Sequence, residues 1–372
     1  MNQAVILLAF LSLVVLFIAF LISRNYISAK AAIVIYVVSI FVTALLYTPG
    51  YGSDLGRYFI ILDSMRGIPI NECNYYGVGT NLFTINFIFW VIANIGFYKL
   101  LPALVVSTVF GIGAYITIDC SIQRKQTKYM GFFLLLQFMQ LPFFGIMDNV
   151  RNVWAFSLVI LAVYRDTIQD KKNLCTLLLY ILPCFMHDGV YLLVLFRFFI
   201  PIAKKLRYVL PIIALFVGTG INMLYMHISV FPSFIANSIK NSYQYLNNSV
   251  ATDWIMYVRT SPFFILQRNS EMFIAVLMIL FLYLIQKNMD KSMSQFSYFA
   301  FLILISVLAC NVFAAPHYWR YYSASMLCIP AIINYSFSIN NRNVLVTSLR
   351  WIYVLSSFLM FALNIWRTYG AY

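Results

Sequence analysis

The first long apolar run of the chain, AVILLAFLSLVVLFIAFLI at residues 4–22, contains no charged residue. A helix rises about 1.5 Å per residue, so a run of this length matches the roughly 30 Å hydrocarbon core of a bilayer. The run lacks the preceding basic region and the small-x-small cleavage site of a signal peptide. We therefore expect a retained membrane span.

The composition extends this expectation to the whole chain. Of its 372 residues, 63% are hydrophobic and only 10% are charged, whereas about 25% are charged in typical soluble proteins. Similar apolar runs recur to the C-terminus, with no polar stretch long enough for a soluble domain. Only helices and closed barrels span membranes, because lipid offers the backbone no hydrogen-bond partners. The sequence predicts an all-α fold, a polytopic integral membrane helix bundle that occupies residues 1–372 as a single domain.

The formal net charge of +14 does not indicate a nucleic-acid partner. The basic residues come in short clusters between apolar runs, a pattern typical of the cytoplasmic loops of membrane proteins. The clusters are Arg24/Lys30, Arg124/Lys125/Lys128, Arg165/Lys171/Lys172, Arg197/Lys204/Lys205/Arg207, Lys287/Lys291 and Arg342/Arg350. If these clusters are cytoplasmic, that face carries 16 basic and 4 acidic residues, and the opposite face carries 9 basic and 7 acidic residues. This asymmetry follows the positive-inside rule.

The same assignment of sides predicts about twelve spans in a GT-C-like bundle. We expect them near 4–22, 31–47, 100–118, 129–147, 151–165, 174–186, 189–200, 209–228, 265–285, 296–314, 321–338 and 348–366. A span at 80–96 would reverse the sides, so we expect a re-entrant or interfacial helix there; the alternative is a different orientation of the first two spans. Outer loops are expected near 48–99 and 229–262, and a tight reversal near Met186–Gly189.

Cysteine and histidine patterns indicate no resident metal. The six cysteines form no CxxC pair, and the three histidines form no HxxxH motif or His/Cys cluster. We expect no cofactor and no protein-built metal site. A divalent ion held by aspartate and substrate phosphate stays an open alternative.

Several charged residues outside the basic clusters fall on the face opposite to them. They are Asp54, Arg57, Asp148, Arg151, His187, Asp188, Arg268, Glu271, His317 and Arg320. The pairs 54/57, 148/151 and 317/320 are three apart, so each pair is expected to share a helix face. Simpler interpretations exist: ion pairs at helix starts, a satisfied buried histidine, and an interfacial aromatic belt for Tyr318, Trp319, Tyr321 and Tyr322.

The chemistry of this set favours a polyanionic substrate. Arginine is permanently charged and presents a planar fork that suits phosphate oxygens. A nearby histidine is able to take a proton from an attacking hydroxyl. Aromatic side chains suit a lipid tail or a sugar ring. These residue types predict a membrane enzyme that acts outside the cytoplasm on a lipid diphosphate.

Four short motifs resemble those of the EpsG/Wzy family of bacterial polysaccharide repeat-unit polymerases. A G-[TS]-D-x-x-x-Y loop reads Gly52-Ser53-Asp54-Leu55-Gly56-Arg57-Tyr58, and an R-Q-x-x-A segment reads Arg151-Asn152-Val153-Trp154-Ala155. An F-H-x-S-A-like segment reads Phe185-Met186-His187-Asp188-Gly189-Val190, and a late arginine-tyrosine segment reads Trp319-Arg320-Tyr321-Tyr322. This chain has asparagine for the usual glutamine at 152 and an inserted methionine at 186, and residues 188–190 depart from the small and alanine positions.

The resemblance implies polymerisation of undecaprenyl-diphosphate-linked oligosaccharides on the periplasmic or outer face of the bacterial inner membrane. The donor and the acceptor are both lipid-linked, and a Wzz-like chain-length regulator is an expected partner. We assign Arg151 and Arg320, with Arg57 as a third, to the donor diphosphate. His187 or Asp54 is the general base, and neither is preferred. Weaker sugar or lipid contacts are assigned to Tyr58, His317, Trp319 and Tyr321.

Three other functions compete with a polymerase. A flippase for lipid-linked oligosaccharide would share the substrate, but it would carry charge along a central path and repeat-built halves, which this sequence lacks. An O-antigen ligase-like glycosyltransferase differs only in its acceptor. A noncatalytic scaffold would need none of the candidate site residues.

Overall fold

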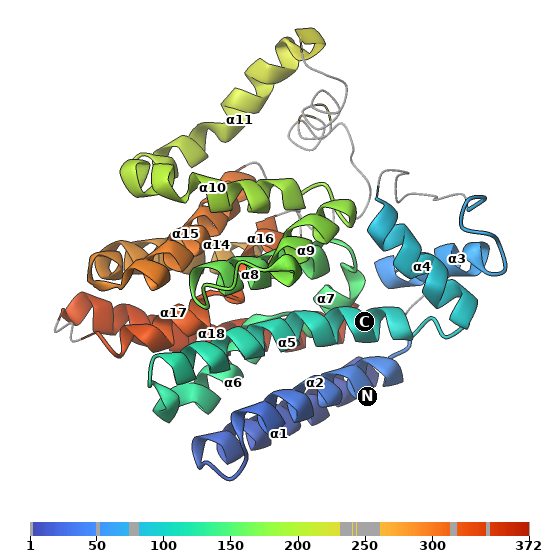
Figure 1. Cartoon of the computed structure of the whole chain (residues 1–372), viewed down its shortest axis with the longest axis horizontal. Helices are drawn as coiled ribbons and strands as arrows, with labels where there is room; N and C mark the ends of the chain where they lie inside the picture. Colours follow the sequence, from blue (N-terminus) through green and yellow to red (C-terminus); the bar gives the residue numbers. More distant parts are fainter. Residues whose placement is uncertain are drawn as a thin grey trace.

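The computed structural model describes residues 3–49, 53–73, 82–230, 240, 243, 261–312, 318–339 and 343–371, and their regular structure is entirely helical (Figure 1). The α-helices are α1 (Gln3–Ser23), α2 (Ala29–Leu46), α3 (Asp54–Met65), α4 (Phe83–Ile95), α5 (Leu100–Gln123), α6 (Met130–Gln140), α7 (Phe143–Asp148), α8 (Asn152–Thr167), α9 (Leu174–Ile181), α10 (Val190–Leu206), α11 (Leu210–Met226), α14 (Pro262–Ile285), α15 (Lys291–Val312), α16 (Tyr318–Met326), α17 (Ile329–Ser336) and α18 (Val344–Ala371). Short 3₁₀ helices are η1 (Thr127–Tyr129), η2 (Leu182–Phe185), η3 (Ile228–Val230) and η4 (Gln286–Asn288).

Six helices in the described residues are long and apolar enough to cross a membrane. They are Gln3–Ser23, Ala29–Leu46, Leu100–Gln123, Pro262–Asn288, Lys291–Cys310 and Val344–Thr368. The all-helical expectation is confirmed, and these six helices fit a multi-pass helical membrane protein.

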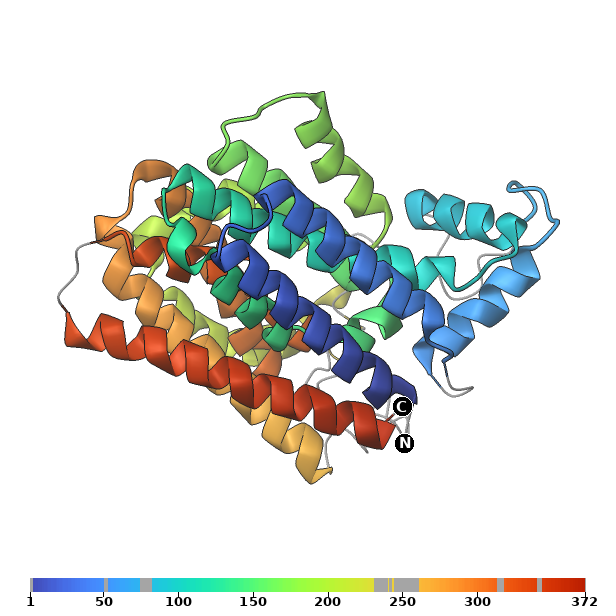
Figure 2. The ribbon, with the colours of Figure 1, turned by 90° about the horizontal axis from the view of Figure 1, so that it is seen from below.

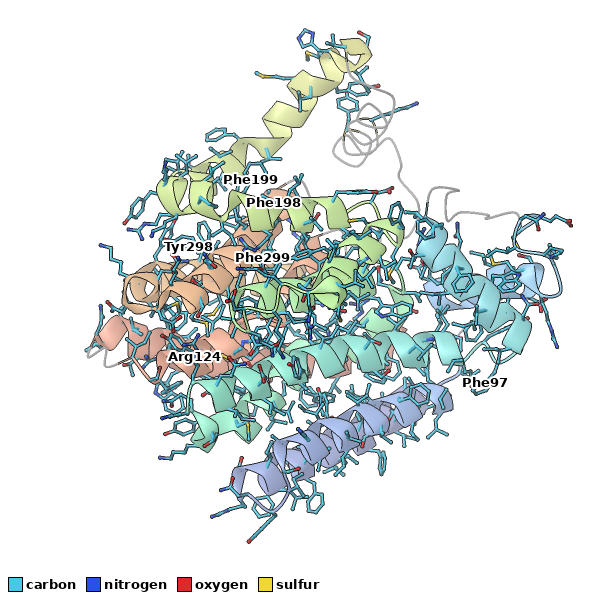
Figure 3. The ribbon with its side chains drawn as sticks, viewed as in Figure 1. Phe97, Arg124, Phe198, Phe199, Tyr298 and Phe299 are labelled. Carbon is cyan, nitrogen blue, oxygen red and sulfur yellow. The ribbon has the colours of Figure 1, made fainter. Side chains whose placement is uncertain are left out.

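The helices form a bundle with a buried centre and an apolar outer surface. α5 and α15 lie inside, since 83% and 78% of the residues in their most apolar stretches are buried. In α1 and α2 the corresponding shares are 33% and 28%. Seen from below, α1, α2 and α18 run along the outside of the bundle (Figure 2). Phe299 of α15 is fully buried, but Phe198 of α10 is 72% exposed (Figure 3). An exposed apolar surface of this extent suits contact with lipid.

Three of the expected spans consist of two helical pieces each. Pro142 separates α6 from α7, Pro183 falls in η2 after α9, and Pro330 lies in the first turn of α17, which follows α16. Proline lacks a backbone N–H and disfavours helical geometry in the residue before it, so each chain segment bends at these positions.

The turns that carry the basic clusters lie together at one end of the bundle, on the left of Figure 1, which we call the basic end. There Arg124, at the end of α5, forms an ion pair of 2.7 Å with Asp290 and a hydrogen bond of 2.7 Å to the Ser292 hydroxyl (Figure 3). The Tyr335 hydroxyl of α17 donates to the Asp290 carboxylate at 2.9 Å. This network ties α5, α15 and α17 together.

The expected interfacial helix at 80–96 is α4, whose 13 residues span roughly 20 Å and fall short of the hydrocarbon core. It forms a hairpin with α3 at the end of the bundle opposite to the basic end, beside both termini (Figures 1 and 2). Trp90 Nε1 donates to the Ile68 carbonyl at 2.8 Å, and Tyr98 donates to Asp63 at 2.9 Å. The expected outer loop 48–99 therefore contains a folded hairpin, whereas most of 229–262 lies outside the described residues.

Gly131 allows α6 to approach α1 closely. A Cβ at this position would meet the Ala19 carbonyl oxygen and the Ser23 hydroxyl oxygen. We expect Gly131→Ala to lower the thermal unfolding temperature in detergent, because overpacking costs about 1–3 kcal/mol. Gly220→Ala on α11 is the matched control, since a Cβ there meets nothing within 4 Å. Equal unfolding temperatures for the two variants would contradict this close packing.

Asp290 makes the basic end sensitive to acid. Its partial desolvation favours a higher pKa, but hydrogen bonds from the Met293 N–H, Ser292 and Tyr335, together with Arg124, outweigh desolvation and lower the pKa of Asp290 below its usual value. A carboxyl with a lowered native pKa stabilises the fold above its unfolded pKa, and this stabilisation is lost as the pH falls through the native pKa.

We expect Asp290→Asn to destabilise the protein by about 1 kcal/mol at neutral pH, a value reduced for partial solvent exposure. The difference from wild type should shrink below about pH 4 and vanish once the native carboxyl is protonated. Thermal unfolding across this range measures it. Asp170→Asn is the control, because the Asp170–Lys172 pair is highly exposed and should contribute little. A pH-independent difference for Asp290→Asn would refute this account.

Candidate functional site

The side chain of Asn152, at the start of α8, joins two of the expected site residues. In the amide orientation that satisfies both neighbours, its oxygen lies 3.1, 3.2 and 3.3 Å from Nε, Nη1 and Nη2 of Arg320, in the first turn of α16. Its amide nitrogen contacts Nε2 of His187 and lies 3.2 Å from Nδ1 of the same ring. Asn152 is only 7% exposed. The structure thus brings together positions 152, 187 and 320, from three distant parts of the sequence.

His187 lies in the reversal between η2 and α10, where the sequence predicts a tight hairpin. Its backbone N–H donates to the Pro183 carbonyl at 3.3 Å, and its carbonyl accepts from the Val190 N–H at 3.1 Å. A Cβ on Gly189 would stand 3.1 Å from the His187 ring and 3.4 Å from Phe156. A glycine at 189 therefore lets the imidazole lie against the turn, edge-on to the Phe156 ring of α8 at 6.2 Å.

Two N–H donors face the ring of His187. The Gly189 backbone N–H is 2.9 Å from Nδ1, and the Asn152 amide nitrogen is in contact with Nε2. A neutral imidazole has one lone pair in its plane, so it accepts one of these bonds at a time. The orientation of the Asn152 amide and the tautomer of His187 are therefore tied to each other.

Arg320 decides which way the amide turns. A guanidinium has only donors, so it selects the amide oxygen. A hydrogen bond to a charged group contributes about 1.5–3 kcal/mol, against about 0.5–1.5 kcal/mol for a neutral one. The Arg320 contact therefore favours the orientation in which the amide nitrogen faces the His187 ring.

Arg151 precedes Asn152 and contacts the α3–α4 hairpin. Its Nε donates to the Tyr58 hydroxyl at 3.1 Å, and its guanidinium carbon lies 6.0 Å from the centre of the Tyr58 ring. Tyr58 in turn packs edge-on against Phe89 of α4 at 5.5 Å. The Arg151–Tyr58 bond thus attaches α3 to the start of α8.

Asp54 and Arg57 form an ion pair with each other, and their side chains are 44% and 72% exposed. Ser53 caps α3 by accepting from the Gly56 N–H at 3.0 Å, so Asp54 stands in the first turn of that helix. Their spacing of three does place this pair on one helix face, as expected. In the described residues, neither side chain bonds to His187, Asn152 or Arg320.

The expectation of a shared helix face for Asp148 and Arg151 is wrong. α7 ends at Asp148 and α8 begins at Asn152, so a turn separates the two residues. His317 lies outside the described residues, and its pairing with Arg320 is not tested.

The aromatic residues of α16 differ in burial. Tyr318 and Tyr322 are buried, and the Tyr322 hydroxyl donates to Gln140 of α6 at 2.5 Å, so these two tyrosines pack in the core. Trp319 and Tyr321 are partly buried, and the Tyr321 ring lies 5.4 Å from Phe156 on the side of Asn152.

α14 contributes a buried carboxyl group, that of Glu271. It is 2% exposed and accepts from Gln267 of the same helix at 2.9 Å. Arg367 of α18 and the buried Tyr318–Tyr322 face of α16 lie near it.

Asn152 is the site residue whose role the sequence analysis missed. Its motif position was noted only as an amide that replaces a glutamine. The available signal was its helical spacing of four from Phe156, which places both on the α8 face toward His187. No family model, curated protein or solved structure matches the chain.

The Arg151–Tyr58 bond predicts energetic coupling between α3 and α8. In a double-mutant cycle on thermal stability, we expect Tyr58→Phe and Arg151→Met to couple by about 1 kcal/mol, since each change removes one partner of the bond. Tyr58→Phe with Arg57→Met is the control pair. It should be additive within about 0.5 kcal/mol, because adjacent helix residues do not face each other. Additivity in the first cycle would show that the contact does not join the helices.

Proposed function

We propose that the protein is a membrane glycosyltransferase that polymerises oligosaccharide repeat units carried on undecaprenyl diphosphate. The observation that carries this proposal is the contact of Asn152 with His187 and Arg320, next to Arg151 at the start of α8. The set combines permanent cations suited to diphosphate with a proton acceptor suited to a sugar hydroxyl. The start of α8 lies opposite to the basic end, as the positive-inside rule requires for an outward-facing site.

The proposed topology has twelve crossings in a GT-C-like bundle of the bacterial inner membrane. Six crossings would be the long apolar helices. Three of the other crossings would be the single helices α8, α10 and α11. The last three would be α6–α7, α9–η2 and α16–α17, each made of two consecutive helical pieces. With the basic end in the cytoplasm, α3 and α4 lie at the periplasmic or outer surface. The site then stands at headgroup level, where a lipid-anchored diphosphate is found.

In the proposed reaction the donor diphosphate binds Arg151 and Arg320. The acceptor sugar hydroxyl attacks the anomeric carbon of the donor glycan, a new C–O bond forms, and the bond from that carbon to the diphosphate oxygen breaks. The hydroxyl proton passes to His187, and the bonding electrons leave on the lipid diphosphate. The arginines stabilise this developing negative charge, which grows in the transition state.

The geometry favours His187 over Asp54 as the general base. The Asp54 carboxylate is paired with Arg57 on an exposed part of α3, whereas His187 belongs to the same contact group as Arg320. We therefore leave Asp54 and Arg57 out of the reacting set. Tyr58 keeps a supporting role through Arg151, and Trp319 and Tyr321 are proposed to contact the glycan or the lipid.

The proposal is tested by a gel ladder of surface polysaccharide from a strain lacking this gene, complemented with wild type or variants of equal membrane abundance. We expect Arg151→Ala, Arg320→Ala and His187→Ala to leave single-repeat caps without a ladder. Arg151→Lys should fail as well, because an ammonium lacks the planar fork. Arg57→Ala is the control and should restore the ladder.

Each other outcome indicates a different function. Loss of all repeats in the deletion strain, single caps included, would indicate a flippase or a ligase. A normal ladder with alanine at both Arg151 and Arg320 would indicate a noncatalytic scaffold.

A further inference from the structure

Glu271 is the only acidic residue that is fully buried in the part of the chain that the structure describes, with 2% of its surface exposed. It belongs to α14, one of the helices long and apolar enough to cross a membrane. An ionisable side chain inside a membrane is costly, and it usually marks a site or a path for ions or protons. The proposed transfer reaction does not use Glu271, so its burial needs another explanation.

Gln267, four residues earlier on the same helix and also 2% exposed, donates its amide nitrogen to Oε1 of Glu271 at 2.9 Å. The other carboxyl oxygen, Oε2, and the amide oxygen of Gln267 are buried and have no hydrogen-bond partner among the described residues. Both atoms are acceptors while the carboxyl is ionised, so they are unable to bond to each other. A proton on Oε2 turns that oxygen into a donor to the amide oxygen. With the existing N–H bond, it closes a ring of two hydrogen bonds.

The charged and titratable groups around Glu271 come from three helices: Arg268 of α14, Arg367 of α18, and Tyr318 and Tyr322 of α16. In the described residues, none of them forms an ion pair with the carboxyl. α15 also packs against α14, but its one charged residue, Lys291, lies at the basic end. A buried carboxylate without an ion pair carries a large desolvation cost, which a neutral acid avoids.

A row of buried polar side chains leads from this pair toward the basic end. The Tyr322 hydroxyl, which lies near Glu271, donates to Gln140 of α6 at 2.5 Å. Gln137 precedes Gln140 by three residues and shares its helix face. The Gln137 amide lies against Gly113 of α5, where a Cβ would meet the amide nitrogen. The row therefore passes from α16 through α6 to α5.

The row continues along α5, where Thr117 and Ser121 follow Gly113 at spacings of four. The Ser121 hydroxyl donates to the Thr117 carbonyl at 2.5 Å and accepts from Asn334 of α17 at 2.6 Å, next to the turn after α5. The members of the row, each at most 2% exposed, are Tyr322, Gln140, Gln137, Thr117, Ser121 and Asn334. Buried polar groups of this kind bind ordered water, and rows of them carry protons in membrane proteins.

We propose that Glu271 and Gln267 form a proton-binding site, which exchanges its proton with the basic end through this row. A proton from water at the basic end adds to the Glu271 carboxylate and gives the neutral acid, and no other covalent bond changes. With the basic end in the cytoplasm, the proton comes from the cytoplasm. The bound proton removes a negative charge near Arg367. Because this exchange involves no sugar and no lipid diphosphate, the proposal goes beyond the proposed polymerase and is tested without it.

Infrared difference spectroscopy in lipid nanodiscs at about pH 7, where an ordinary glutamate is ionised, detects the proton. The C=O stretch of a neutral carboxyl absorbs at a higher frequency than a carboxylate. We expect wild type minus Glu271→Gln to show one neutral carboxyl band. Gln267→Leu should raise the frequency of this band, because the Glu271 carbonyl loses the amide N–H, and this variant tests the site even if Glu271→Gln does not fold. A carboxylate signal in wild type, or an unchanged band in Gln267→Leu, overturns the proton site.

The route is tested by the rate at which the neutral carboxyl band shifts after transfer to D₂O. Gln137→Leu should slow this exchange about tenfold, since it removes one hydrogen-bonding step from the row. Gln286→Leu is the matched control and should exchange at the wild-type rate. Gln286 is also buried, and both polar atoms of its amide lack a partner among the described residues, but it lies in η4, outside the row. A wild-type rate in Gln137→Leu, or equal slowing in both variants, overturns the route.

Discussion

The lack of hydrogen-bond partners in lipid is the constraint on which the structure depends. Helices satisfy backbone groups internally, and charged side chains are least costly at the ends of a bundle or in pairs. Arg124 and Asp290 pair at the basic end, and Arg320, Asn152 and His187 lie together at the opposite end. The first network joins the ends of α5, α15 and α17 through an ion pair and hydrogen bonds. The second includes a histidine and an arginine whose shared partner is a neutral amide, an arrangement open to exchange with a substrate.

The breaks in the helices decide where the site forms. The turn between α7 and α8 ends one helix and starts another, so Arg151 and Asn152 stand at a helix beginning with their side chains directed to different partners. The bend at Pro183 and the small residue at Gly189 bring His187 over the same helix. If these helices were continuous, the side chains of Asn152 and His187 would not meet. The departures from regular helix are therefore what assembles the group.

The sequence predicts the class of fold well because hydropathy and charge bias report directly on the membrane. It also predicts the short helix at 80–96 and the reversal at Met186–Gly189, where a full span would conflict with the neighbouring basic clusters. Spacing rules fail at Asp148 and Arg151, because they assume an unbroken helix. The contact between Asn152 and Arg320 is beyond single-sequence reasoning, since a neutral amide carries no hydropathy or charge signal and its partner is far along the chain. Charge drew attention to Arg57, which the structure leaves exposed and paired with its neighbour.

The position of the site fits the proposed chemistry for an electrostatic reason. An arginine deep in hydrocarbon is costly, and one in bulk water is screened, so headgroup level is where a guanidinium binds a diphosphate strongly at moderate cost. The Asn152 oxygen faces the Arg320 guanidinium without a permanent counter-charge. A carboxylate in this position would hold the guanidinium more tightly and would compete with the substrate. A neutral amide binds the guanidinium less tightly than a carboxylate does, so it competes less with the diphosphate of the proposed substrate.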